Sequence, residues 1–411
     1  MSIIKDISLA PSGEMKINWV ERNMPVLRGI GRRFSEEKPF KGLKVALSVH
    51  LEAKTAYLCR VMELGGAEMY VTGSNPLSTQ DDVAAALAAG GMNVFAEYGC
   101  NEQQYNDCLR EVLKIGPNII IDDGGDLVHL MHEEFADLIP EVIGGCEETT
   151  TGINRLRKMS ASGALRFPMV MVNDADCKHM FDNRYGTGQS VWDGICRTTN
   201  LIVAGKYVVI SGYGWCGKGV SLRAKGLGAK VIVTETDPVR ALEAVMDGYE
   251  VMPMAEAARI GDIFCTVTGG RDIISAEHFP LMKDGAILSN AGHFNVEIDM
   301  QALENMAVKK YEARHNIQGY VMPDGRTLFT IAEGRLVNLA AADGHPAEIM
   351  DMSFAIQALS AKYLADNRGR LSADVVPVPR EIDREVAECK LEAMGVGIDR
   401  LSREQAEYLG K

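Results

Sequence analysis

The sequence lacks several features that mark other protein classes. Its nine cysteines include no Cys-x-x-Cys pair, so we expect no zinc or other metal site and reduced thiols in the cytoplasm. No apolar run approaches the roughly 20 residues of a membrane span, and Met1 to Pro11 lack the charged-then-apolar pattern of a signal peptide. Lys and Arg total 43 against 56 Asp and Glu. The resulting charge of −13 disfavours nucleic acid and anionic membranes as partners.

The composition is that of an ordinary globular protein. Apolar residues make up 46% of the chain and charged residues 24%, which excludes disordered and fibrous classes. At about 100–200 residues per domain, the 411 residues predict two to four domains. Because composition excludes classes without naming a function, the function must be read from local sites.

Two series of short β-branched runs alternate with helical patterns. In the first series we expect strands at 43–49, 68–72, 93–97 and 118–121, separated by helices at 53–64, 81–89 and 102–115. In the second we expect strands at 207–210, 231–234, 263–267 and 286–289. This rhythm predicts the α/β class: two doubly wound Rossmann-like domains with parallel sheets, and a small helical C-terminal segment.

A glycine motif opens the second series. Gly212, Gly214 and Gly217 follow a buried strand as Gly-x-Gly-x-x-Gly, and Glu235 ends the next strand about 20 residues further on. The glycines permit a tight turn and close approach of a pyrophosphate, and the carboxylate suits a ribose diol. Because a carboxylate there would repel a 2′-phosphate, the motif predicts NAD as the cofactor.

Other interpretations of the glycine motif stay open. A P-loop would need Ser or Thr after the lysine of Gly217-Lys218, but Gly219 stands there. The motif could also be a glycine-rich turn without a ligand. With NAD favoured, residues 1–180 are the predicted substrate-binding domain with a returning segment at 347–378, residues 190–345 the NAD-binding domain, and residues 379–411 a C-terminal helical segment.

Polar residues also gather after the strands of the first series. His50 follows one strand, Asp122 to Asp126 another, and Glu147 to Thr151 and Lys178 to Asn183 come later. An acidic loop of this kind is ordinarily a solvated cap or a divalent-metal site. The wider pattern of motifs favours another interpretation.

Several motifs occur in one order along nearly the whole chain. They are Asp122-Asp-Gly-Gly-Asp126, Glu147-Glu-Thr-Thr-Thr-Gly152, Phe181-Asp-Asn183, Gly212-Tyr-Gly-Trp-Cys-Gly-Lys-Gly219, Gly292-His-Phe294, Glu333 to Leu339 and Gly344-His-Pro346. This order resembles the S-adenosyl-L-homocysteine hydrolase family. Such extended colinearity is far more specific than any one motif.

The resemblance implies an NAD-dependent hydrolase of the methyl cycle that cleaves the thioether of an S-nucleosyl-L-homocysteine reversibly, through a 3′-keto intermediate. The implied catalytic residues are His50, Asp123, Glu148, Lys178, Asp182 and His293. Lys178 with Asp182 would handle the 3′-hydroxyl proton, and Glu148 the ribose hydroxyls. The histidines with Asp123 would serve the 4′ proton, the leaving group and water. We expect Lys178 to have a lowered pKa.

The resemblance extends to the cofactor and to the assembly. It implies NAD contacts from Thr149, Thr150, Thr151, Asn183, the glycine motif, Glu235, Asn338 and His345. It implies a homotetramer, with the helix expected over Arg380–Lys411 as a contact element. The Lys- and Tyr-bearing tail of longer members is absent after Tyr408, which puts NAD contacts between protomers in doubt. A cysteine common in the family is Thr187 here.

The main departure from the family lies beside His50. Where better-known members have Thr and Glu, this sequence has Glu52 and Lys54, and Asp343 stands where Met is common. In the family the glutamate accepts from the adenine amine, whereas Lys54 would donate to O6 of hypoxanthine and Glu52 would accept from N1–H. We therefore expect S-inosyl-L-homocysteine as the substrate. The alternative is that Lys54 pairs with Glu52 or points to solvent and adenine is accepted.

Two other classes compete with the hydrolase. An NAD-dependent 2-hydroxy acid dehydrogenase shares the two-domain plan but would accumulate NADH. A silent NAD-binding homologue is disfavoured because every reactive position is filled. The expected partners are therefore small: a nucleosyl-homocysteine, homocysteine and the nucleoside.

Overall fold

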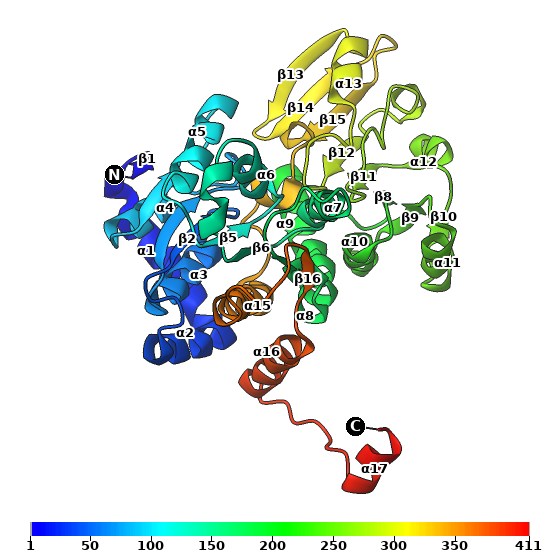
Figure 1. Cartoon of the computed structure of the whole chain (residues 1–411). Helices are drawn as coiled ribbons and strands as arrows, with labels where there is room; N and C mark the ends of the chain where they lie inside the picture. The colour runs from blue at the N-terminus through cyan, green and yellow to red at the C-terminus, as the bar shows by residue number, and fades with distance from the viewer. Residues whose placement is uncertain (1, 411) are drawn as a thin grey trace.

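The computed structural model describes residues 2–410, so Met1 and Lys411, at the ends of two predicted segments, lie outside the described part. The described chain forms two eight-stranded sheets (Figure 1). No helix among these residues could cross a membrane.

The strands of each sheet are given below in their order across the sheet. The first sheet is β1 (Ile3–Ile4), β4 (Asn93–Ala96), β3 (Glu68–Thr72), β2 (Lys44–Ser48), β5 (Ile119–Asp122), β6 (Gly144–Glu147), β7 (Met169–Met171) and β16 (Val375–Pro377). The second is β10 (Glu250–Val251), β9 (Lys230–Thr234), β8 (Tyr207–Ser211), β11 (Ile263–Thr266), β12 (Ile287–Asn290), β15 (Thr327–Ile331), β14 (Ile317–Val321) and β13 (Lys309–Arg314).

Every pairing in the first sheet is parallel. The second sheet is parallel from β10 to β15 and antiparallel across β14 and β13. The predicted α/β class with two Rossmann-like sheets is confirmed. The helix predicted over 53–64 has the observed bounds of α3, and the strands over 68–72 and 207–210 match β3 and most of β8.

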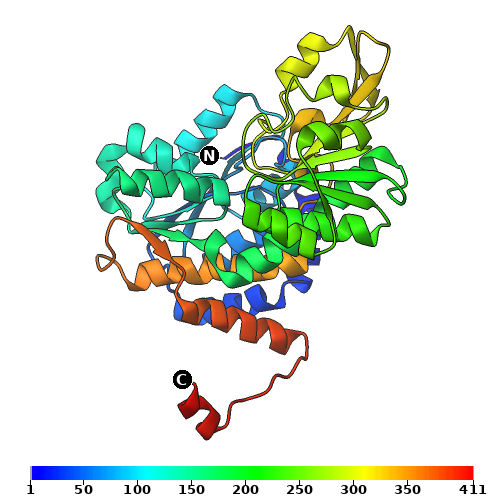
Figure 2. The ribbon, with the colours of Figure 1, turned by 90° about the vertical axis from the view of Figure 1, so that its right-hand side faces the viewer.

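Helices cover both faces of each sheet, as the apolar faces of parallel strands require (Figure 2). They are α1 (Ala10–Arg22), α2 (Pro25–Glu37), α3 (Ala53–Leu64), α4 (Asp81–Ala89), α5 (Glu102–Leu113), α6 (Asp126–Glu133), α7 (Thr150–Ala161), α8 (Asp176–Lys178), α9 (Thr187–Thr199), α10 (Trp215–Gly226), α11 (Pro238–Met246), α12 (Met254–Ile260), α13 (Met300–Met306), α14 (Val337–Ala340), α15 (Ala347–Asp366), α16 (Arg380–Ala393) and α17 (Arg403–Tyr408). The π-helix His179–Gly186 joins α8 to α9, so the polar crossing between the sheets is helical.

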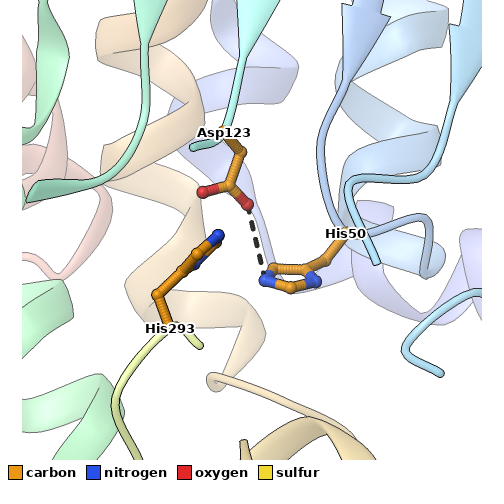
Figure 3. A group of neighbouring side chains, drawn as sticks. All are labelled: His50, Asp123 and His293. Atoms are coloured by element: carbon orange, nitrogen blue, oxygen red, sulfur yellow. Dashed lines mark ion pairs between the residues drawn. The ribbon is translucent and has the colours of Figure 1, made fainter. Parts of the chain in front are cut away.

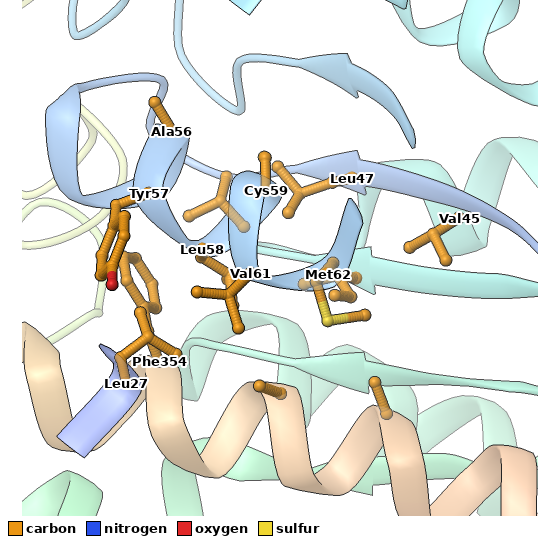
Figure 4. Packing of buried hydrophobic residues seen from close by; sticks show 14 of the residues in the cluster. Leu27, Val45, Leu47, Ala56, Tyr57, Leu58, Cys59, Val61, Met62 and Phe354 are labelled. Carbon is orange, nitrogen blue, oxygen red and sulfur yellow. The ribbon is translucent and has the colours of Figure 1, made fainter. Parts of the chain in front are cut away.

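The largest core lies between the first sheet and α2, α3, α4 and α15 (Figure 4). Leu47 of β2, Leu58 of α3 and Phe354 of α15 meet there, each almost fully buried. α15 comes late in the chain yet packs on the first sheet, and β16 pairs with β7. The division into domains at the predicted boundaries stays a prediction, because sheet membership does not show which parts fold or move together.

The C-terminal segment differs from expectation. A single helix over Arg380–Lys411 is wrong, because α16 stops at Ala393 and only α17 follows. Gly395 takes a φ of +67°, which ends the helix in a left-handed turn. The chain then runs away from the body to α17, near the end of the described residues (Figure 1).

Candidate active site

His50 and Asp123 lie at the topological switch point of the first sheet. They follow β2 and β5, neighbouring strands between which the chain order reverses, and side chains converge at such points. His50 Nε2 is 3.4 Å from Asp123 Oδ2, and His293 reaches in from the second sheet (Figure 3). One ligand-type atom from each residue lies within 4.8 Å of the others. The structure thus brings three predicted catalytic residues together.

Ser78 and Asp123 lie next to the two ring nitrogens of His50. Ser78 Oγ donates to Asn75 O at 3.0 Å and lies 2.6 Å from His50 Nδ1. Ser78 thus shares a hydrogen bond with Nδ1, while Nε2 faces the Asp123 carboxylate. Burial lowers the pKa of His50 to about 4, so the ring is neutral near pH 7. His50 can therefore accept a proton in the space between the three side chains.

Lys178 is the centre of a second cluster. Its Nζ donates to Asn173 Oδ1 at 3.1 Å and to Asn183 Oδ1 at 3.0 Å, and lies 3.3 Å from Asp182 and 3.7 Å from Glu148. The expected lowered pKa of Lys178 is not what the structure shows. Burial opposes the charge, but the two carboxylates outweigh it and raise the pKa of Lys178.

Asp182 stays ionised in this cluster. Burial opposes its charge, yet Lys178 and His345 hold the pKa of Asp182 well below its usual range. His345 Nδ1 is 2.5 Å from Asp182, and Asn338 Nδ2 lies 3.2 Å from His345 Nε2. Because the amide donates to Nε2, the His345 proton sits on Nδ1 and points at Asp182. Asp182 is therefore suited to holding Lys178 and His345 in place.

Glu148 has the opposite character. Its side chain is buried, and Gln357 Nε2 donates to its Oε2 at 2.5 Å. Burial, only partly offset by Lys178, raises the pKa of Glu148 to about 7. Glu148 can thus donate or accept a proton near neutral pH, which suits a partner of ribose hydroxyls.

The glycine motif lies at the switch point of the second sheet, between β8 and β11. A Cβ on Gly217 would fall 1.9 Å from Gly212 O, so only glycine allows this turn to close under α10. Glu235 follows β9 and accepts the Tyr213 N–H at 2.7 Å. The predicted motif and its acid are thus adjacent at this switch point, at the carboxyl ends of the strands, which we call the dinucleotide crevice.

The remaining predicted cofactor residues border the Lys178 cluster. Thr149 occupies the N-cap position of α7 without a side-chain capping hydrogen bond, and Thr150 and Thr151 begin that helix. Thr150 Oγ1 accepts from Asn173, which links this helix to Lys178. Asn338 Oδ1 is buried without a partner, and an unpaired buried acceptor fits a carboxamide donor such as that of nicotinamide. The residues present therefore fit NAD.

Two of the three predicted base-reading residues are paired, and the side chain of the third lies apart. Lys54 Nζ lies 2.7 Å from Glu52 Oε2 at the start of α3, with 7% and 5% of the two residues exposed. The side chain of Asp343 is 90% exposed and 3.6 Å from Arg197. Only the Asp343 carbonyl reaches the pair, accepting from Lys54 at 3.0 Å. The structure does not bring the Asp343 carboxylate to the pair.

Sequence reasoning missed several polar residues that complete the site. Ser353 Oγ donates to Asp182 at 2.7 Å, and Gln357 holds Glu148. They lie one turn apart within the apolar helix α15, and that spacing was a usable signal. Asp383 of α16 accepts the N–H groups of Asp176 and Cys177, both at 2.8 Å, and so caps the short helix that carries Lys178. Nothing in the sequence pointed to that contact.

Comparison with known proteins identifies the family. Residues 2–139 match the family model "S-adenosyl-L-homocysteine hydrolase", and residues 183–344 match its NAD binding domain. An adenosylhomocysteinase of Thermococcus kodakarensis is 60% identical over 99% of this chain and 96% of its own length. An S-inosyl-L-homocysteine hydrolase of Methanosarcina acetivorans is 58% identical over 98% and 97%.

A third relative, an S-inosyl-L-homocysteine hydrolase of Methanococcus maripaludis, is 57% identical over 100% of this chain and 98% of its own length. Among solved structures, a dipicolinate synthase chain of Bacillus halodurans shares the fold, with a TM-score of 0.50, 14% identity and coverage of 80% of this chain and 99% of its own. The predictions of a hydrolase and of NAD as cofactor are confirmed. The chain therefore belongs to the S-adenosyl-L-homocysteine hydrolase family.

Proposed function

We propose that this enzyme hydrolyses S-inosyl-L-homocysteine to inosine and L-homocysteine. The observation that carries the proposal is the buried pair of Lys54 and Glu52, one turn of chain from His50. Two similar relatives carry the name S-inosyl-L-homocysteine hydrolase. The pair offers a donor and an acceptor side by side, as a purine edge requires.

The order of donor and acceptor decides the base. Hypoxanthine presents an acceptor at O6 and a donor at N1, so Lys54 would face position 6 and Glu52 position 1. Adenine presents the reverse order. A site built for one order rejects the other strongly, because buried polar groups are left unpaired.

The proposed reaction uses both clusters. The glycine motif and Glu235 would hold NAD, which would supply a reversible hydride acceptor for ribose C3′, so that none would be consumed. Lys178 accepts the 3′-hydroxyl proton, and for this its Nζ must first lose a proton. The positive charge of a nearby oxidised cofactor would favour that loss. Asp182 holds Lys178, and Glu148 holds the ribose hydroxyls.

The first cluster serves the elimination and the addition of water. The 3′-ketone acidifies the C4′ proton, which passes to the neutral His50 or to Asp123. The C5′–S bond then breaks, and homocysteine leaves as a thiolate that takes a proton from the same group of side chains. Water adds at C5′, its proton returning through His50, Asp123 or His293, before C4′ is reprotonated and the ketone is reduced.

S-Adenosyl-L-homocysteine is the second candidate substrate. The contact between Lys54 and Glu52 favours this candidate. If the two side chains bind only each other, they do not select against adenine, and other contacts bind the base. The Thermococcus relative is named adenosylhomocysteinase. Adenine would be selected if the pair faced the base in the opposite order.

The deciding experiment measures kcat/KM on both nucleosyl-homocysteines by thiol titration. An inosine preference supports the proposal, and equal rates or an adenosine preference contradicts it. Thiol release without net NADH distinguishes the hydrolase from a dehydrogenase. The homotetramer and the cytoplasmic location stay predictions.

A further inference from the structure

Glu297 is a buried carboxylate to which neither cluster gives a role. It follows β12 on the loop that carries His293, and only 1% of the residue is exposed. Its Oε2 accepts from Thr268 N–H at 2.9 Å and from Thr268 Oγ1 at 2.7 Å, and its Oε1 accepts from Gly269 N–H at 2.7 Å. A buried carboxylate without a cation has to be held by such donors.

The donors belong to the loop that follows β11. That loop borders the glycine motif, because a Cβ on Gly212 would lie 3.1 Å from Thr268 Cγ2. Thr268 therefore stands between the dinucleotide crevice and Glu297. Any group that occupies the crevice beside Gly212 also meets the loop that Glu297 holds.

The loop with His293 is held at its other end by Asn290. Asn290 Nδ2 donates to Phe294 O at 2.9 Å, and Asn290 Oδ1 accepts from Gly292 N–H at 2.7 Å. Glu297 fills the space beside Gly292, where a Cβ would fall 1.8 Å from its Oε1. His293 thus lies on a short span fixed at both ends, and its Nε2 would be 2.9 Å from a Cβ on Gly124 of the first sheet.

We propose that Glu297 is a positioning residue that couples the dinucleotide crevice to His293. A ligand in the crevice restricts the motion of the Thr268 loop. Because Glu297 is hydrogen-bonded to that loop, it then also restricts the motion of its own loop, which places His293 beside His50 and Asp123. The coupling between the two loops can be measured without reference to catalysis. Only its effect on activity rests on the proposed catalytic role of His293.

The test measures amide hydrogen exchange in residues 291–297 of the NAD-loaded enzyme and of the same enzyme after the cofactor is removed. We expect NAD to slow exchange about tenfold in the wild-type enzyme, equivalent to about 1.4 kcal/mol of opening free energy. In Glu297→Gln the effect should fall below about twofold, because an amide cannot accept from both neighbouring N–H donors. Equal slowing in both proteins would overturn the proposal. Glu256→Gln, on an exposed side chain, is the control.

A second pair of variants keeps the test decisive if Glu297→Gln does not fold. Thr268→Ser keeps the hydroxyl that donates to Glu297, whereas Thr268→Val removes it. Thr268→Val should lower the NAD-dependent slowing in residues 291–297, and Thr268→Ser should retain it. Identical behaviour of the two variants would contradict the coupling.

Activity then separates positioning from general stability. If Glu297 acts through His293, Glu297→Gln should lower kcat/KM about 30-fold in the wild-type background but less than about threefold when added to His293→Ala. Equal losses in both backgrounds would contradict action through His293. The exchange result stands even if the proposed substrate is wrong, so the two failures are distinguishable.

Discussion

Lys54 Nζ lies 2.7 Å from Glu52 Oε2, and Glu52 also caps α3 by accepting the Lys54 N–H at 3.0 Å. The carboxylate therefore has one oxygen engaged by Lys54 and one left for a ligand. The ammonium group has donors to spare beyond Glu52 and the Asp343 carbonyl. The pair can thus bind a base without first being broken.

Reversing the charge at position 54 should change the preferred base. In Lys54→Glu we expect the ratio of kcat/KM on the adenosine substrate to that on the inosine substrate to rise by about 100-fold, because the donor facing O6 becomes an acceptor. Steady-state kinetics on both substrates provide the measurement. Lys41→Glu makes the same charge change at an exposed site and should leave the ratio unaltered. An unchanged ratio in Lys54→Glu would place the lysine outside base recognition.

Glu148 should make the stability of the NAD-free protein depend on pH. Its pKa is raised by burial to about 7, so the folded protein binds this proton more tightly than the unfolded chain does. The stabilisation is complete below about pH 4.5 and is lost as the pH rises through 7.

Compared with Glu148→Gln, the wild-type free energy of unfolding should therefore fall by up to about 3 kcal/mol between pH 4.5 and 8. Urea unfolding at several pH values measures the difference. Glu256→Gln, on the surface, should show no such trend. Parallel pH profiles for wild type and Glu148→Gln would mean that Glu148 is ionised throughout.

Asp383 should affect catalysis although it lies on the C-terminal helix α16. Its carboxylate caps the helix that carries Lys178. Asp383→Ala should cost about 1 kcal/mol of stability and lower kcat about tenfold with KM little changed, whereas Asp383→Asn should recover part of both because its amide oxygen can still accept. Unaltered kcat in Asp383→Ala would show that Lys178 holds its position without the cap.

The sequence predicted eight of the strands, β2 to β5 and β8, β9, β11 and β12, because these buried strands show as β-branched runs between helical patterns. It did not predict β1, β6, β7, β10 and β16, nor β13 to β15. β13 reads Lys-Lys-Tyr-Glu-Ala-Arg and is exposed at every position, so it has no apolar periodicity to detect. The antiparallel extension follows from pairing with β14, which the local sequence does not encode.

The same distinction applies to the site. Residues that directly follow a strand, such as His50 and Asp123, were predictable because parallel strands end at one edge of a sheet. Ser353 and Asp383 reach the Lys178 cluster from helices about 200 residues later, through tertiary packing alone. The carboxylate of Asp343 lies apart from Lys54 and Glu52, since sequence proximity to His345 says nothing about the direction of its side chain; its role at the base stays a prediction.

The buried Asp351 of α15 should be the most sensitive stabilising charge outside the site. It is fully buried, accepts the N–H groups of Val26 and Leu27 at the start of α2, and lies 3.0 Å from Lys390 Nζ of α16. α2, near the start of the chain, thus meets the consecutive helices α15 and α16 at one carboxylate. Removing it leaves two buried N–H groups without an acceptor and leaves Lys390 with only the Glu348 carbonyl, at 2.8 Å.

Asp351→Ala should therefore lower the free energy of unfolding by about 3–5 kcal/mol. Lys390→Met should cost less, about 1–2 kcal/mol, because the two N–H groups still hold the carboxylate. Urea unfolding of both variants measures the difference, and the double variant should be less destabilised than the sum of the single variants. If the two single variants were equally destabilised, the ion pair would outweigh the helix cap. If Asp351→Ala lowered the free energy of unfolding less than Lys390→Met, the buried carboxylate would be destabilising by itself and Lys390 would only neutralise its charge.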